Sequence, residues 1–140
     1  MIIYTKLDTY NTNYIFFGDI IKNTVITNGK FIRIIYSNKT YTLNGLYILV
    51  PLVNIKKINS STCSINNNNS CIKNLCNIEK DILGKYITSK TKEYKLQEQL
   101  NKNIIKIFNS KNTFKKIIIK ISGLWEDDNS CGLTYKFINY

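Results

Sequence analysis

The first half of the chain consists of short β-branched and aromatic runs that are separated by polar turns. Such runs are typical of strands, and four of them occur, at 1–7, 13–20, 30–37 and 40–53. Turn signals at Asn28-Gly29 and at 37–39 separate the later runs. The last run is long, and we expect it to bend near Asn44-Gly45 and to stop at Pro51, the only proline.

The middle of the chain changes first to a polar segment and then to a helical pattern. Residues 54–74 are rich in asparagine, with four in succession, which is typical of a loop. We interpret this segment as a mobile surface insertion within a single domain that spans 1–140. After it, apolar residues recur three or four positions apart, which predicts a helix with Gly84 as its weak point. These residues are Leu75, Ile78, Ile82, Leu83 and Tyr86.

A second helical pattern covers 89–108 and is the strongest in the chain. Thr88-Ser89 supplies natural N-cap residues before it. Five apolar residues then share one helical face, namely Leu96, Leu100, Ile104, Ile107 and Phe108. The two patterns predict either one kinked helix or two separate helices.

The C-terminal segment returns to the alternation of strands. Ile117, Ile119 and Ile121 alternate with Lys116, Ile118 and Lys120, and a second alternating run follows at 133–138. The residues between these runs, "EDDNSCG", have turn chemistry, with Gly132 supplying backbone freedom. We therefore expect an antiparallel hairpin. Four strands, a helical part and two strands predict a β-rich α+β fold or a small barrel with an inserted helical connection.

Composition adds a strong positive charge, although it does not by itself reveal a partner. The formal net charge is +11, yet isoleucine, lysine and asparagine, whose codons are A/T-rich, make up 64 of the 140 residues. Arg33 is the only arginine. A basic domain attracts polyanions whatever the origin of its charge. Functional anion binding and simple solubilisation by lysine therefore both remain open.

Residue chemistry argues against an enzyme, a metal site and a membrane protein. The chain has no histidine, so the commonest general base is absent, and it has no phosphate-cradling glycine-rich loop. Four cysteines without a C-x-x-C pair predict free thiols in a reducing compartment. Glu126, Asp127 and Asp128 are typical of a solvated turn. We expect no cofactor, no small-molecule substrate, no secretion signal and no membrane span.

Six residues are candidates for nucleic-acid binding. Alternation places Phe31 and Arg33 on one face of their strand, and Lys116, Lys120 and Lys136 on the hairpin face opposite Ile117, Ile119 and Ile121. Aromatic rings can stack on bases while cations hold phosphates. For Phe31 and Arg33 the alternative is a core ring and a strand-edge charge. Trp125 is either a buried hairpin anchor or a stacking platform.

The stretch "IKISGLWEDDNSCGLTYKF" resembles the C-terminal hairpin of a family of small proteins from large eukaryotic DNA viruses. In that family an apolar strand ends in a Gly-x-Trp-Glu turn, and the next strand reads Gly-Leu-Thr-Tyr-Lys-Phe. These positions match Gly123, Trp125 and Glu126, and then 132–137. The family is similar to the single-stranded-DNA-binding proteins of tailed phages, which have an OB fold with a helix inserted between the third and fourth strands.

The resemblance implies an OB-like small barrel with a C-terminal β-hairpin and a helical insertion. It also implies a non-enzymatic, sequence-independent single-stranded-DNA-binding protein that acts in viral replication, recombination or repair. Its place would be intracellular, in the host cytoplasm or a viral factory, and packaging in the virion and self-association stay open. The alternative is a structural or interaction protein of the virion or the virus factory.

Overall fold

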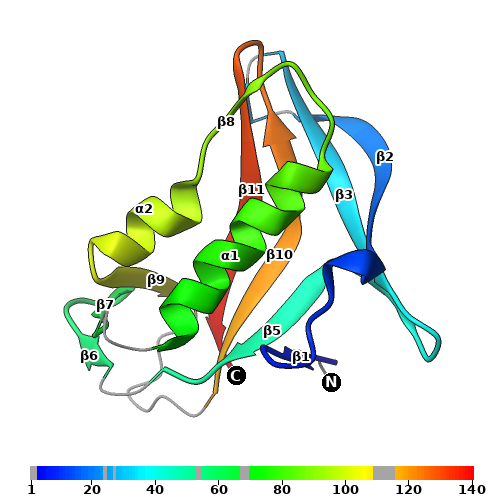
Figure 1. The fold of residues 1–140 in the computed structure, drawn as a ribbon. Coiled ribbons are helices and arrows are strands. Elements are labelled where there is room, and N and C mark those ends of the chain that lie inside the picture. Colours follow the sequence, from blue (N-terminus) through cyan, green and yellow to red (C-terminus); the bar gives the residue numbers. More distant parts are fainter. Residues whose placement is uncertain (1–2, 24, 27, 53–54, 67–69, 109–115) are drawn as a thin grey trace.

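The computed structural model describes residues 3–23, 25–26, 28–52, 55–66, 70–108 and 116–140. Strands account for 48% of the described residues and helices for 21%, which confirms the β-rich α+β class. The elements, shown in Figure 1, are β1 (Thr5–Lys6), a 3-10 turn (Thr12–Tyr14), β2 (Ile15–Asn23), β3 (Gly29–Ser37), β4 (Thr42–Asn44), β5 (Leu46–Val50), β6 (Lys56–Lys57), β7 (Thr62–Ser64), α1 (Ser70–Lys85), β8 (Thr91–Lys92), α2 (Lys95–Asn101), β9 (Ile104–Phe108), β10 (Ile117–Glu126) and β11 (Ser130–Asn139).

The hairpin of β10 and β11 is the centre of the sheet. The two strands pair antiparallel from Ile117, opposite Asn139, to Glu126, opposite Cys131, as the alternation predicts. The first half of β10 also pairs with β5, and its second half pairs with β3. The register shifts at Ser122, where β10 carries one extra residue. This bulge lies where β10 changes its neighbour from β5 to β3.

The outer strands extend the sheet on both sides of this hairpin. Strand β3 pairs with β2 and β4, while β11 pairs with β8 and β9, and β9 continues to β7 and β6. Within the described residues β2 pairs only with β3 and β6 only with β7, so the sheet does not close. The predicted OB-like barrel is therefore not confirmed, whereas the C-terminal hairpin and the helical connection are present.

One face of the sheet is covered by α1, with α2 beside it (Figure 1). On β10 this face carries Ile117, Ile119 and Ile121 before the bulge and Leu124 after it, and all four are buried. From α1 the core receives Leu75, Ile78, Ile82 and Leu83, the residues whose spacing predicts the helix. The helix starts at Ser70, inside the segment predicted to be a loop.

The prediction of a helix over 89–108 is wrong for most of its length. Only Lys95–Asn101 is helical, and Thr91–Lys92 and Ile104–Phe108 are strands. Asn103 adopts a left-handed backbone conformation with φ 60°, which ends the helix. The β-branched residues after it pair with β7 and β11. Sheet pairing between distant segments therefore overrides the local helical spacing.

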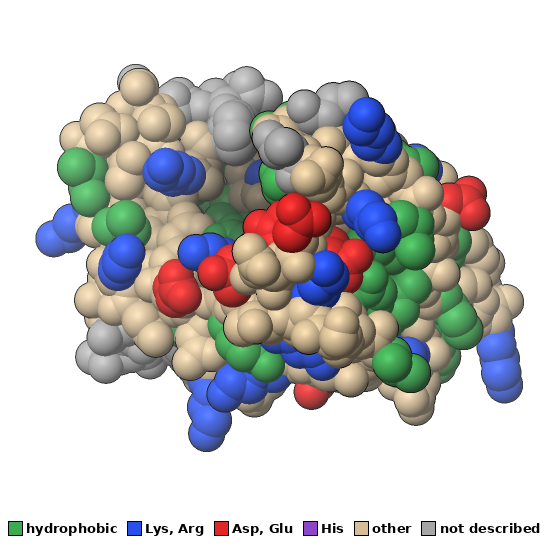
Figure 2. Space-filling model, turned by 90° about the horizontal axis from the view of Figure 1, so that it is seen from above, with side chains coloured by type: hydrophobic (Ala, Val, Ile, Leu, Met, Phe, Trp, Pro, Cys, Tyr) green, Lys and Arg blue, Asp and Glu red, His purple; other side chains and the backbone are tan. Residues whose placement is uncertain are grey.

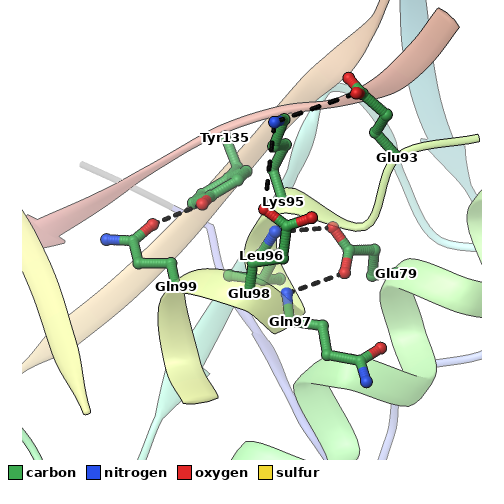
Figure 3. Close-up of polar contacts among 8 residues, drawn as sticks. All are labelled: Glu79, Glu93, Lys95, Leu96, Gln97, Glu98, Gln99 and Tyr135. Carbon is green, nitrogen blue, oxygen red and sulfur yellow. Dashed lines mark hydrogen bonds and ion pairs between the residues drawn. The ribbon is translucent and has the colours of Figure 1, made fainter. Parts of the chain in front are cut away.

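The predicted caps Thr88-Ser89 do not start this helix. The N-cap position of α2 is Tyr94, whose side chain makes no capping bond. Instead the carboxylate of Glu79 on α1 accepts hydrogen bonds from the backbone N–H groups of Leu96 at 2.8 Å and Gln97 at 2.9 Å (Figure 3). Glu79 is fully buried. One helix therefore caps the other through a side chain of the core.

The α2 region is also held to the sheet. Tyr135 of β11 donates a hydrogen bond to the side chain of Gln99 on α2 (Figure 3). Burial raises the pKa of Tyr135 from the ordinary 10.0 to about 12, so this phenol remains a hydrogen-bond donor at pH values where an ordinary tyrosine ionises. Lys95 makes only long contacts at the surface, 4.0 Å to Glu93 and 3.9 Å to Glu98.

Several turn predictions are confirmed. Asn28 has φ 56° immediately before β3, and Asn38 accepts bonds from two backbone N–H groups in the turn before β4. Gly45 has φ 91° and separates β4 from β5, and β5 ends at Val50, immediately before the proline. The bend in the fourth run therefore follows from a glycine conformation that other residues rarely adopt.

The asparagine-rich segment 54–74 contains more regular structure than predicted. Strands β6 and β7 pair within it, and its last residues belong to α1. Residues 54 and 67–69 of this segment lie outside the described residues, and its mobility stays a prediction. All four cysteines are free thiols. In the described chain, neither helix has the length and apolar character required to cross a membrane.

We predict that Glu79→Ala destabilises the protein through the loss of the cap on α2. The substitution leaves two N–H groups without partners, so we expect a loss of about 2 to 4 kcal/mol in the free energy of unfolding. Urea unfolding followed by circular dichroism measures it. The control is Glu98→Ala, which removes an exposed carboxylate from α2 itself and should change stability by less than about 0.5 kcal/mol. Equal effects of the two substitutions would contradict the capping role.

We also predict an unusual pH dependence from Glu79. Burial raises its pKa above the ordinary 4.5, and this outweighs the opposite effect of the two N–H donors. Just above that pH, the folded protein holds a proton that the unfolded chain has released. The contribution of Glu79 to stability is therefore complete below this range and declines as the pH rises through the folded-state pKa.

The measurement is the difference in unfolding free energy between the wild type and Glu79→Gln, from about pH 4 to about pH 8. As the pH rises, the unfolding free energy of the wild type should fall relative to that of Glu79→Gln. A difference that moves in favour of the wild type would show that the two N–H donors dominate over burial.

Candidate nucleic-acid interface

The sheet face that points away from α1, here called the open face, gathers most of the predicted binding residues. Strand β3 buries Ile32, Ile34 and Tyr36 in the core, so Phe31 and Arg33 lie on the other side. Across the strands, Trp125 is opposite Phe31, and Lys120 is opposite Lys136. The extra residue Ser122 shifts the alternation of β10 by one position, and Trp125 therefore lies on this face.

Five of the six predicted residues therefore share the open face from β3 to β11. Arg33 and Lys136 are exposed, while Phe31, Lys120 and Trp125 are partly buried. The sixth, Lys116, precedes β10 at the far end of the strand. Its ammonium lies 3.3 Å from the hydroxyl of Tyr4 and 5.4 Å from the centre of that ring. Lys116 therefore adds a positive charge beyond the open face, at a distance from Phe31 and Trp125.

Two tyrosines join the predicted residues on this surface. Tyr4 contacts Lys116, and the ring of Tyr47 on β5 has the ammonium of Lys120 5.5 Å from its centre. Tyr47 alternates with buried Leu46 and Ile48, so its place on the open face could have been inferred from the sequence. Such cation–π contacts orient a lysine while leaving its donors available.

Two glycines make room for the aromatic rings. A Cβ at Gly123 would lie 2.8 Å from the ring of Phe31, and a Cβ at Gly132 would lie 2.8 Å from the indole nitrogen of Trp125. Each ring therefore lies over the backbone of a neighbouring strand. Neither ring belongs to the buried core. This is an arrangement in which one side of a ring is supported and the other side can receive a base.

Two adjacent grooves cross the open face. The larger one is lined by Ile21 and Val25 beside Phe31 and Trp125, and it is mainly apolar. The smaller one is lined by Phe31, Arg33, Asn44, Lys120 and Ser122. They share Phe31 and Ser122, so an aromatic groove continues directly into a basic one.

Positive charge on the open face is not neutralised by ion pairs. In the part of the chain that the structure describes, Arg33, Lys120 and Lys136 have no carboxylate within 4.0 Å, and both recorded ion pairs involve Lys95. Lys120 and Lys136 are direct cross-strand neighbours, a placement of like charges that destabilises a sheet. A bound polyanion would remove this repulsion.

The predicted acidic turn has a structural role. Glu126 is buried and accepts hydrogen bonds from Thr88 at 3.1 Å and Tyr86 at 3.3 Å. Asp127 accepts from the backbone N–H groups of Asn129 and Ser130, and these bonds lower the pKa of its carboxyl group. Figure 2, which looks at the end of the molecule that carries this turn, shows a central group of acidic side chains with lysines around it, and further acidic side chains at the edges of the view.

The acidic side chains do not form a metal centre. In the described residues no group of three or more histidine, cysteine or carboxylate side chains could hold a metal ion. Glu79 caps α2 and Glu126 faces Thr88 and Tyr86, so neither points to the open face. The arrangement on that face is chemically suited to binding an anion with flat aromatic parts.

No protein-family model, curated protein or solved structure matches this chain.

We predict that Gly132→Ala displaces the indole of Trp125. The added methyl group would lie 2.8 to 2.9 Å from three ring atoms, so the ring must lift from the strand. Trp125 is the only tryptophan, and its fluorescence therefore reports on this site alone. We expect red-shifted emission, stronger acrylamide quenching and a stability loss of about 1 to 3 kcal/mol.

Gly84→Ala is the matched control, because no atom lies within 4 Å of its added methyl group. It should leave the emission unchanged and stabilise α1 by about 0.5 to 1 kcal/mol. Unchanged emission from Gly132→Ala would mean that the indole does not lie on Gly132.

Proposed function

We propose that this protein binds single-stranded DNA through the open face, without sequence preference and without catalysing a reaction. The observation that supports this most strongly is the juxtaposition on one face of Phe31 and Trp125, each supported by a glycine, with Arg33, Lys120 and Lys136. These three cations lack carboxylate partners among the described residues. Aromatic platforms beside a basic groove are typical of proteins that bind single strands.

The aromatic rings favour a single strand over a duplex. In a duplex the flat faces of the bases are occupied by their neighbours, so only the phosphates would be available to this surface. In a single strand the bases can turn toward Phe31 and Trp125 while the phosphates face the cations. Stacking tolerates every base because each has a π-face. We therefore expect discrimination between strand states and none between sequences.

The family resemblance supports the biological part of the proposal. It suggests a role in the replication, recombination or repair of a large DNA virus, in the host cytoplasm or a viral factory. Helix α1 lies between β7 and β8, within the connection from β5 to β10, and this helical connection is compatible with the helix inserted in the OB folds of the phage proteins. We propose that the sheet is a divergent relative of that fold.

A second candidate function, protein contacts within a virion or virus factory, is favoured by the apolar side chains of β2 and the residues that follow. Phe16, Ile20, Ile21 and Val25 are exposed by 51%, 60%, 47% and 90%. In the described residues β2 has one strand neighbour, β3, so its other edge is unpaired. Self-association through this edge would be compatible with either function.

We predict that binding of labelled oligo-dT, measured by fluorescence anisotropy, is tighter than binding of the corresponding duplex and weakens steeply with salt. Replacing Lys116, Lys120 and Lys136 together with alanine should reduce the slope of log K against log salt by about 2, since each single-strand phosphate contact contributes about 0.7. Replacing Phe31 or Trp125 should cost about 1 to 3 kcal/mol of binding energy with little change in slope.

The control is a second triple variant that also loses three lysines, but at positions away from the open face. Lys39, Lys73 and Lys80 are exposed and lie outside the open face. Their replacement by alanine should change the slope much less than the replacement of Lys116, Lys120 and Lys136. Equal affinity for duplex and single strand, with no dependence on Phe31 or Trp125, would leave only a generic basic surface and would favour the role in protein contacts.

A further inference from the structure

The only arginine of the chain stands in the smaller groove of the open face. Lysine occupies the other 19 of the 20 basic positions. Arg33 is exposed on β3, opposite Gly123 of β10, which has no side chain to cover it. A guanidinium differs from an ammonium because its planar fork can bind two oxygens of one phosphate at once. Position 33 is therefore where such a bidentate contact is chemically available.

The bulge in β10 brings a hydroxyl to the same groove. Ser122 is the extra residue at the register shift, and both Ser122 and Lys120 line the groove with Arg33. Bulges re-aim side chains and are frequent next to binding sites. Asn44 lines the groove from β4, where it pairs with Ile35, the residue two positions beyond Arg33 on the same face.

The polar side chains of this groove have hydrogen-bonding capacity to spare. Within the described part of the chain, the side chains of Arg33, Asn44 and Ser122 make no hydrogen bond, and Lys120 contacts only the ring of Tyr47. No carboxylate lies within 4.0 Å of either cation in that part of the chain. The groove therefore combines two positive charges with further donors that all lack protein acceptors, which is the chemistry of an oxyanion site.

We propose that this groove is a phosphodiester subsite in which Arg33 holds two phosphate oxygens in a bidentate contact. Lys120 supplies the second charge, while Ser122 and Asn44 donate hydrogen bonds. Phe31 lines both grooves, so it stacks the base attached to this phosphate, and the next base lies in the larger groove against Trp125. This inference rests on the proposed function, and it adds a role for arginine that charge alone cannot fill.

The test combines an affinity measurement with a direct signal from the arginine. Labelled dT5 is titrated against the wild type, Arg33→Lys and Ser122→Ala. Arg33→Lys keeps the charge, so the salt slope should stay the same while affinity falls about tenfold. Ser122→Ala should lower affinity by a smaller factor. Lys80→Arg and Ser89→Ala, both at exposed positions away from the groove, are the matched controls and should bind as the wild type does.

The wild-type protein offers a second readout, because one arginine gives one side-chain Nε–Hε signal in a nitrogen–proton NMR spectrum. We expect dT5 to shift this signal and slow its exchange with water, and inorganic phosphate at the same concentration to have little effect. Thermal melts of every variant confirm that it is folded.

The outcomes separate the two proposals. If dT5 binds but Arg33→Lys binds equally well and the Nε–Hε signal does not move, the subsite is overturned while single-strand binding stands. If inorganic phosphate moves the signal as strongly as dT5 does, the groove is a simple anion site and the phosphodiester assignment is overturned. If the wild type binds no oligonucleotide at all, the proposed function itself is overturned.

Discussion

The pairing of β10 with three other strands is the interaction on which the rest of the structure depends. Strand β10 pairs with β11 along its whole length, with β5 through its first half and with β3 through its second half. In the described residues, β3 and β5 are connected to β11 only through hydrogen bonds with β10. The bulge at Ser122 belongs to this constraint, because it keeps Ile121 and Leu124 on one face although they are three positions apart.

The same bulge shapes the open face. By keeping Leu124 in the core it leaves Gly123 and Trp125 on the opposite side, next to Phe31 and Arg33 of β3. Gly123 and Gly132 then leave space that the two rings occupy. The physical requirements of the core and of the candidate interface are therefore met by one irregularity in one strand. A regular strand would have turned Trp125 toward α1.

The two buried carboxylates lie on the helix side of the sheet and not on the open face. The buried carboxylates Glu79 and Glu126 are used on the helix side, to cap α2 and to bind Tyr86 and Thr88. The open face presents cations without carboxylate neighbours in the described chain. A composition that raises lysine throughout the sequence explains the number of cations. It does not explain why Arg33, Lys120 and Lys136 meet beside aromatic rings, and that placement supports a function in binding.

The sequence by itself determined the features that depend on neighbouring residues. Alternation placed Phe31 and Arg33 opposite Ile32 and Ile34, the spacing of apolar residues identified α1, and Gly45 and Pro51 marked a bend and an end. Tertiary structure decided the features that depend on distant partners. The stretch after Asn103 became a strand because β7 and β11 offered hydrogen bonds, which outweigh helical spacing. The cap of α2 comes from Glu79, the bulge at Ser122 arises where β10 changes partners, and the groove that joins Arg33 to Asn44 and Ser122 exists only once three strands are aligned. Within a regular strand the local pattern reports which face a side chain takes, whereas bulges and the pairing of strands distant in the sequence depend on partners that the local pattern does not specify.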